Sequence, residues 1–254
     1  MTIVMSNRII SEKIYLITLF IWIVVASLVT TTYFIRLEGF LSLYRILLYF
    51  TIAMILIKEL VNFPKTLYYF RFHWQQLLIV MGLFIAMFIV AKNRDGLLDI
   101  NVLLLVFSAR DIDFRKLLGT FSAATFLVLC LTIYASQQGI IANMFMNADS
   151  GYRFSLGFNY VSFASQRLFF ALCTYLMFRG KRISYLELLA LLLATIYMYQ
   201  QTSTTSPFYL SILILTYAFF SIKIFKKDFI IENFWVKTLA HYGFILALAI
   251  ILYF

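Results

Sequence analysis

The sequence is short of charged residues. Asp, Glu, Lys and Arg make up 13% of its 254 residues, whereas hydrophobic residues make up 63%. Soluble domains usually carry about 25% charged and about 45–50% apolar residues. So few charges cannot cover the surface of a water-soluble domain of this length. The composition therefore excludes that class and favours a protein that lies in lipid.

The sequence also lacks the residue patterns that hold metals and nucleotides. Its two cysteines, Cys130 and Cys173, lie inside apolar runs, and we expect them to be small core residues rather than a disulfide or a metal pair. His73 and His241 have no metal-ligand spacing. A glycine-rich phosphate loop and an aspartate-rich metal motif are missing as well. We therefore expect no metal and no cofactor.

The charges that are present are mostly positive, and the net charge is +10. In a soluble protein this excess would suggest binding to nucleic acid. Here the lysines and arginines lie in short stretches between apolar runs, which is typical of the positive-inside rule for membrane proteins. We expect membrane lipids, and not nucleic acid, as partners.

Apolar runs of about 20 residues can cross the hydrocarbon layer as helices. The distribution of Lys and Arg between loops favours nine crossings, with the N-terminus inside and the C-terminus outside. The fourth run is short and carries Asp99 and Asn101, so it could instead be a re-entrant segment. We expect an all-α polytopic transmembrane helix bundle that forms one domain over residues 1–254. The predicted spans are Ile14–Ile35, Leu41–Ile57, Trp74–Ala91, Leu97–Ala109, Leu117–Ala135, Phe158–Phe178, Ser184–Tyr199, Phe208–Ile222 and Leu239–Phe254.

One polar stretch, Asn147–Gly157, interrupts the apolar runs on the predicted outer side. Arg153 is the only cation between Ala135 and Asn159. A guanidinium binds phosphate oxygens in a bidentate manner, so Arg153 is a candidate anion-binding group. The alternative is an interfacial arginine that reaches toward lipid headgroups. Asp149, four residues earlier, is a candidate general base.

A second arginine, Arg167, falls near the middle of the predicted sixth span. A charge at that depth is costly unless it faces a polar interior or a partner. Ser165 and Gln166 are polar neighbours, and a structural pair with Glu187 of the next span is the alternative. The hydroxyl-rich stretch 200–206 is either a solvated connector or a donor of hydrogen bonds to sugar or phosphate.

The run Arg153-Phe-Ser-Leu-Gly-Phe158 resembles the R-x-S-L-G-F motif of bacterial polysaccharide polymerases of the Wzy type, which belong to the O-antigen ligase and polymerase group. The order of features around it is similar too: an inner basic loop at Ser108–Lys116, a span, the motif, another span, a basic turn at Arg179–Arg182, and a later Ser/Thr-rich outer loop. The resemblance covers roughly Leu97–Ile222.

The resemblance implies a multi-pass protein of the bacterial inner membrane that polymerises undecaprenyl-pyrophosphate-linked oligosaccharides during capsule or exopolysaccharide synthesis. Such a glycosyltransferase-type enzyme needs no metal, because positioned cations stabilise the pyrophosphate leaving group. Arg153 and Asp149 are the expected catalytic residues. Other membrane proteins of polysaccharide assembly are possible partners. The expected substrate-binding residues are Arg153, Ser155, Arg167, Thr202 and Thr204.

The sequence departs from the family pattern at two places. Tyr160-Val-Ser162 stands where such polymerases usually have a His-Pro-Asn-like tripeptide, and Thr202–Ser206 lacks the arginine usual in that loop. The chain also stops inside its ninth apolar run. Two alternatives therefore stand beside the polymerase: a flippase or transporter for the same lipid-linked saccharide, and an inactive truncated remnant.

Overall fold

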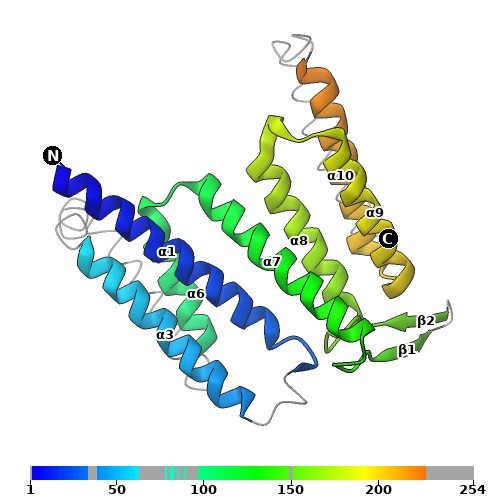
Figure 1. The fold of residues 1–254 in the computed structure, drawn as a ribbon, viewed down its shortest axis with the longest axis horizontal. Helices are drawn as coiled ribbons and strands as arrows, with labels where there is room; N and C mark the ends of the chain where they lie inside the picture. Colours follow the sequence, from blue (N-terminus) through cyan, green and yellow to red (C-terminus); the bar gives the residue numbers. More distant parts are fainter. Residues whose placement is uncertain are drawn as a thin grey trace. The chain divides into compact units, whose positions relative to one another are not determined.

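The computed structural model describes residues 2–33, 39–62, 97–148 and 151–226, together with positions 78, 81, 82, 85 and 89. Within these residues the chain forms seven α-helices, two 3-10 helices and one two-stranded sheet (Figure 1). The prediction of an all-α chain is confirmed for these residues, with one short β-hairpin as an exception. The predicted span Leu239–Phe254, and most of Trp74–Ala91, lie outside the described residues.

Three of the described helices are long and apolar enough to cross a membrane. They are Ile9–Leu28 within α1 (Thr2–Leu28), α7 (Phe114–Gln137) and α8 (Val161–Arg179). Length and composition thus support the character of a membrane protein. Cys130 is exposed on α7, so the prediction that it is a core residue is wrong, whereas Cys173 on α8 is half-buried.

The chain divides into two compact units. The first consists of Met1–Val29 and Phe34–Ala124, and the second of Thr30–Tyr33 and Thr125–Phe254. Helix α7 therefore contributes its first half to one unit and its second half to the other. The two units are described separately below, and a single domain stays a prediction.

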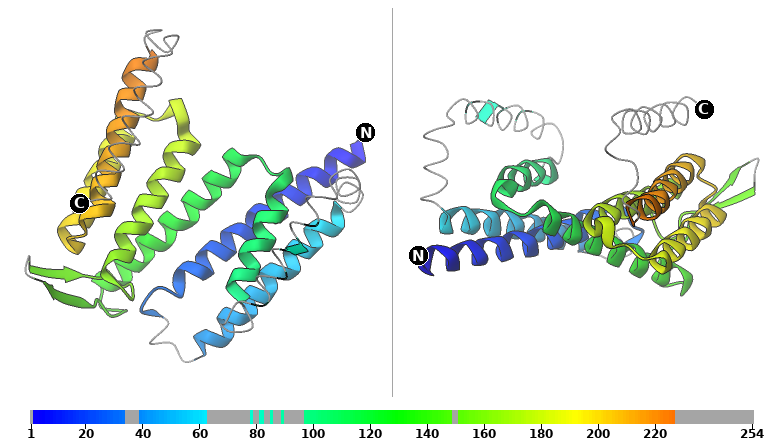
Figure 2. Two further views of the ribbon diagram at one scale, coloured as in Figure 1. Left: turned by 180° about the vertical axis from the view of Figure 1, so that it is seen from behind. Right: turned by 90° about the horizontal axis from the view of Figure 1, so that it is seen from above.

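The first unit contains α1, α3 (Phe40–Val61) and α6 (Leu97–Ser108). Helices α1 and α3 run side by side in both views of Figure 2. Apolar side chains of the three helices form a core together with Ala124 of α7, and the hydroxyl of Tyr15 donates a 3.0 Å hydrogen bond to the Leu105 carbonyl. The core residues are Tyr15, Leu19, Ile23, Ile55, Leu105 and Ala124.

Helix α6 coincides with the predicted fourth span. Its twelve residues rise about 18 Å, which is less than the roughly 30 Å of a bilayer core. Asn101, one of the two polar residues in this predicted span, is fully buried and accepts a 2.5 Å hydrogen bond from Thr51 of α3. A buried amide with a partner is tolerated inside a packed core.

A cluster of charged side chains ties the end of α3 to the segment after α6. Lys58 is fully buried, and its ammonium donates to Glu59 at 2.9 Å and to the Ser108 carbonyl at 2.6 Å. Glu59 also accepts from the Ser108 hydroxyl and from Arg110, each at 2.7 Å. Burial raises the pKa of the Glu59 carboxyl, but these hydrogen bonds and the two cations outweigh burial and leave the pKa below 4.5.

The second unit contains α8, α9 (Tyr185–Thr202), α10 (Thr205–Lys226) and the hairpin of β1 (Phe145–Ala148) and β2 (Gly151–Phe154). Helix α9 begins with a capping box, in which Ser184 and Glu187 satisfy each other's backbone N–H groups. The preceding basic turn, 179–182, is confirmed as a break between helices, because α8 ends at Arg179 and a 3-10 turn follows.

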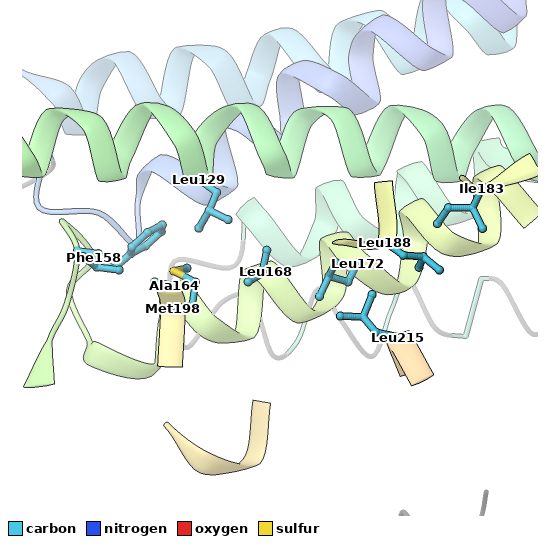
Figure 3. Packing of buried hydrophobic residues seen from close by; sticks show 10 residues of the cluster. Leu129, Phe158, Ala164, Leu168, Leu172, Ile183, Leu188, Met198 and Leu215 are labelled. Atoms are coloured by element: carbon cyan, nitrogen blue, oxygen red, sulfur yellow. The ribbon is translucent and has the colours of Figure 1, made fainter. Parts of the chain in front are cut away.

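Apolar side chains from α7, α8, α9 and α10, from the segment before α8 and from the turn after it form the core of the second unit (Figure 3). Phe158 lies beside Ala164 at one end of this core, and Ile183 lies at the other end. Phe158, Ala164 and Leu172 are completely buried. The last residue of the resembling motif is therefore an anchor of the core, which fixes the chain just before α8 begins.

Candidate functional site

The β-hairpin presents Arg153 at one end of the second unit. Arg153 lies on β2 opposite Met146 of β1, and its side chain is half-buried. In Figure 1 the hairpin lies near the end of the unit where α9 gives way to α10, and β2 contacts α9. Asp149, the predicted base, lies outside the described residues, so its role stays a prediction.

Ser155 closes the hairpin instead of opening toward a ligand. Its backbone N–H donates to the Met144 carbonyl at 2.8 Å, and its hydroxyl accepts from the Met144 N–H at 3.0 Å. The next residue, Leu156, donates its N–H to the Asn143 side chain at 2.9 Å. Ser155 is 0% exposed. These contacts give Ser155 a structural position, and substrate binding by it stays a prediction.

Gly157 occupies a position that only glycine fits well. Its φ is +87°, a left-handed conformation that other residues rarely adopt. A Cβ added there would lie 2.6 Å from Cδ1 of Ile141 and 3.0 Å from Cγ2 of Thr132. The added Cβ would also lie 3.1 Å from Cβ of Ser136. The motif's glycine thus lets the backbone pack against α7 and the loop that follows it.

A short segment after α1, residues 30–32, forms a clamp: it is hydrogen-bonded to the end of the motif. The N–H of Thr32 donates to the Gly157 carbonyl at 2.8 Å, and the Asn159 N–H donates to the Thr30 carbonyl at 2.9 Å. Thr31 forms an isolated β-bridge with Phe158 between these two bonds. The predicted first span, Ile14–Ile35, is wrong at its end, because α1 stops at Leu28 and this segment pairs with the motif.

Arg167 supports the same clamp. Its Nη2 donates a 2.8 Å hydrogen bond to Oγ1 of Thr30, and its guanidinium carbon lies 5.9 Å from the centre of the Phe158 ring. Glu187, the alternative partner, instead forms an ion pair with Arg179 near the opposite end of α8, with 2.6 Å between Oε1 of Glu187 and Nη2 of Arg179. Arg167 is six residues, about 9 Å, from the start of α8, which is shallower than predicted.

Thr202 and Thr204, the predicted hydroxyl donors, are joined by a third residue. The hydroxyls of Thr202 and Thr204 share a 2.8 Å hydrogen bond, and those of Thr202 and Ser165 share one of 2.7 Å. Thr202 is fully buried and also donates to the Met198 carbonyl at 2.8 Å. This hydroxyl cluster, Ser165–Thr202–Thr204, connects α8 with the turn between α9 and α10.

A small cleft opens beside the hydroxyl cluster. The space open to the centre of a water molecule is about 10 Å³, close to the lower limit for holding one water. Tyr199 and Phe208 stack at 4.3 Å between ring centres on its wall. A sugar would therefore need these side chains to move apart. The lining residues are Ser165, Leu168, Thr195, Met198, Tyr199, Thr204, Pro207, Phe208 and Ser211.

The structure thus divides the predicted site residues into two groups. Arg153 and Ser155 belong to the hairpin, whereas Thr202 and Thr204 join Ser165 in the hydroxyl cluster. Arg167 belongs to neither group, since residues 165 and 167 point about 160° apart around a helix. Sequence reasoning missed the role of Ser165 as a partner of Thr202. The available signal was that Ser165 lies on nearly the opposite side of the helix from Arg167.

Among residues that the structure describes, no group of three or more His, Cys, Asp or Glu side chains could hold a metal ion. Of the described residues, those at this end of the second unit include the guanidinium groups of Arg153 and Arg167 and the hydroxyls of the cluster. Comparison with protein-family models, with curated proteins and with solved structures finds no match to this chain.

Proposed function

We propose that the chain is a multi-pass protein of the bacterial inner membrane whose hairpin end faces the outer side. Three helices of sufficient length and apolarity support the membrane part. The end of the second unit away from the hairpin carries Arg179, Lys181 and Arg182, and α10 ends there with Lys223 and Lys226. A concentration of cations at one end favours the cytoplasmic side for that end.

The proposed activity is polymerisation of undecaprenyl-pyrophosphate-linked oligosaccharides. A hydroxyl of one lipid-linked unit attacks the anomeric carbon of another, the glycosidic bond forms, and the lipid pyrophosphate leaves. Negative charge grows on the leaving oxygen, and a cation held in place before the reaction stabilises it most effectively. Arg153 is the proposed cation, and Asp149 is the proposed acceptor of the hydroxyl proton.

The observation that carries this proposal is the way the hairpin holds Arg153. Both strands, the buried Ser155 and the clamped Gly157 fix the backbone on either side of it. The side chain of Arg153 is half-buried, and its Nε atom is buried. A half-buried cation on a backbone held from both sides matches the demand for preorganised charge. The hydroxyl cluster of α8 and α9 lies near the same end of the unit and offers hydrogen-bonding groups for sugar or phosphate oxygens.

The first test uses undecaprenyl pyrophosphate, which contains the leaving group and requires no knowledge of the sugars. The full chain in lipid nanodiscs is expected to bind it, and Arg153→Ala is expected to weaken binding about tenfold or more, the loss of roughly 1.4 kcal/mol or more. Arg153→Lys is expected to restore little, because an ammonium cannot form the bidentate contact. Arg182→Ala, which removes an exposed cation from the basic turn, is the matched control.

The second test separates polymerase, flippase and remnant. The chain is reconstituted in vesicles with lipid-linked oligosaccharides from the strain that carries the gene, and product length is followed on gels. A polymerase lengthens the saccharide, and Arg153→Ala and Asp149→Asn stop this. Movement of substrate across the bilayer without lengthening would replace the proposal with a flippase.

In the binding test, equal affinity of the wild type and of Arg153→Ala for undecaprenyl pyrophosphate would refute the proposed role of Arg153.

A further inference from the structure

The hairpin exposes large apolar side chains that the core of the second unit does not cover. Phe145 is 65% exposed and Tyr152 is 64% exposed. Their rings meet edge to face with centres 6.0 Å apart. Residues 145 and 152 lie on one face of the hairpin, because strand side chains alternate and directly opposed residues share a face.

Exposed apolar residues are also found on the helix and the loop that precede the hairpin. Leu131 and Tyr134 are exposed on α7, one of the helices long enough to cross a membrane. Ile140, in the loop between α7 and the hairpin, and Tyr160, directly before α8, are more than half exposed as well. Exposed apolar residues thus occur on a candidate membrane helix, on the loop that follows it and on the hairpin.

Arg153 lies on the other face of the hairpin, opposite Met146. We propose that the hairpin lies in the boundary between phospholipid headgroups and acyl chains, with Phe145 and Tyr152 turned toward the chains. Aromatic rings are enriched at this depth of a bilayer, where an apolar body and a polar edge are both accommodated. Arg153 then lies at the level of the lipid phosphates, which is also the level of a lipid-linked pyrophosphate.

The backbone limits how deep the hairpin can lie. A two-stranded sheet has two outer edges whose N–H and C=O groups are not paired within the sheet, and exposure of such edges to hydrocarbon is very costly. The hairpin therefore belongs at the interface, where water and headgroups can satisfy those edges. The partner of this surface is the phospholipid leaflet itself, since α7, which precedes the hairpin, is long and apolar enough to cross a membrane and also exposes apolar side chains.

This inference rests on the membrane part of the proposed function and not on the polymerase reaction. The test uses the full chain with Cys130 and Cys173 replaced by Ala, reconstituted in vesicles of phosphatidylcholine and phosphatidylglycerol. A spin label is attached at Tyr152→Cys, and its collisions with oxygen and with a water-soluble nickel complex are compared. Leu131→Cys on α7 is the lipid-facing standard, and Arg182→Cys in the basic turn is the water-facing standard.

The label at position 152 is expected to give an oxygen-to-nickel ratio between those of the two standards and clearly above that of position 182. Phe145→Cys is expected to agree, which protects the result against misfolding of one variant. A ratio equal to that of position 182 would overturn the proposal, and so would protection from both reagents, which indicates that protein covers the hairpin. If the ratio at position 131 also equals that of position 182, the membrane proposal itself fails. If position 131 has a high ratio and position 152 does not, only the interfacial position of the hairpin is refuted.

Discussion

The guanidinium of Arg167 donates a 2.8 Å hydrogen bond to the hydroxyl of Thr30, a residue 137 positions earlier in the chain. The segment that contains Thr30 also donates a backbone hydrogen bond to residue 157 and accepts one from residue 159. Arg167 therefore stabilises the segment that holds the end of the motif in place. Its place in the fold is that of a positioning residue. This assignment can be separated from substrate binding by a double-mutant cycle.

We expect Arg167→Ala and Thr30→Val each to lower the thermal unfolding midpoint in detergent, since a charged hydrogen bond contributes about 1.5–3 kcal/mol. The double variant is expected to lose clearly less than the sum, with a coupling of at least about 0.5 kcal/mol. Additive losses would show that the hydrogen bond contributes nothing to stability. Binding of undecaprenyl pyrophosphate by the folded Arg167 variant at low temperature separates the two roles, because a substrate ligand would lose affinity there.

Gly157 gives a second prediction. Gly157→Ala combines a left-handed backbone with a clash at 2.6 Å against Ile141, so we expect a loss of about 1–3 kcal/mol and a lower unfolding midpoint. Gly139→Ala is the matched control, because Gly139 also has positive φ but a Cβ there would meet nothing within 4 Å. Ile141→Val removes the clashing Cδ1 and is expected to reduce the loss in the double variant. Equal losses at positions 139 and 157 would contradict the packing argument.

The hydroxyl cluster predicts a difference between two substitutions of Thr202. Thr202→Val keeps the shape but removes the hydroxyl that bonds to Ser165 and Thr204, and leaving the buried Ser165 hydroxyl without this partner costs about 1–3 kcal/mol. Thr202→Ser keeps the hydroxyl and should cost less. Thr174→Val on α8, where the hydroxyl bonds only to carbonyls of its own helix in the described contacts, serves as control and should be nearly neutral. Unfolding midpoints that do not distinguish Val from Ser at position 202 would remove the cluster from the stability argument.

The charged cluster of the first unit predicts how stability depends on pH. The folded pKa of Glu59 lies below 4.5, so the unfolded chain takes up this proton first as the pH falls. The stabilisation is therefore complete above roughly pH 5 and is lost as the pH drops through the folded pKa. We expect wild type to exceed Glu59→Gln in stability at neutral pH, and the difference to shrink below pH 4.5. A difference that stays constant down to about pH 3 would show that the ionised carboxylate contributes nothing.

The helices could be predicted from the sequence more easily than their ends. Long apolar runs between basic turns gave α7, α8, α9 and α10 within a few residues, because apolar periodicity and charge both mark where such helices lie. The end of α1 could not be predicted, since residues 29–33 contain no charge, glycine or proline that would mark it. Only pairing with Phe158, far along the chain, turns those residues away from helix.

The candidate site shows the same contrast between local and distant information. The motif and its arginine are visible in the sequence, and so are the threonines of the α9–α10 turn. The hairpin around Arg153 depends on pairing across residues 145–154, and the link from Thr202 to Ser165 spans 37 positions. The partner of Arg167 could not be predicted for the same reason, because neither spacing nor helical periodicity points to Thr30.

The assignment of Thr30–Tyr33 to the second unit has a consequence for how this protein is made and divided. A ribosome completes that segment long before residue 157 exists, so the segment must wait through the synthesis of more than a hundred residues before its hydrogen bonds can form. For the same reason no single cut of the gene yields an intact second unit. A fragment that starts at residue 125 would leave the Gly157 carbonyl and the Asn159 N–H facing a gap, and co-expression of the first helix with its tail would be needed to fill it.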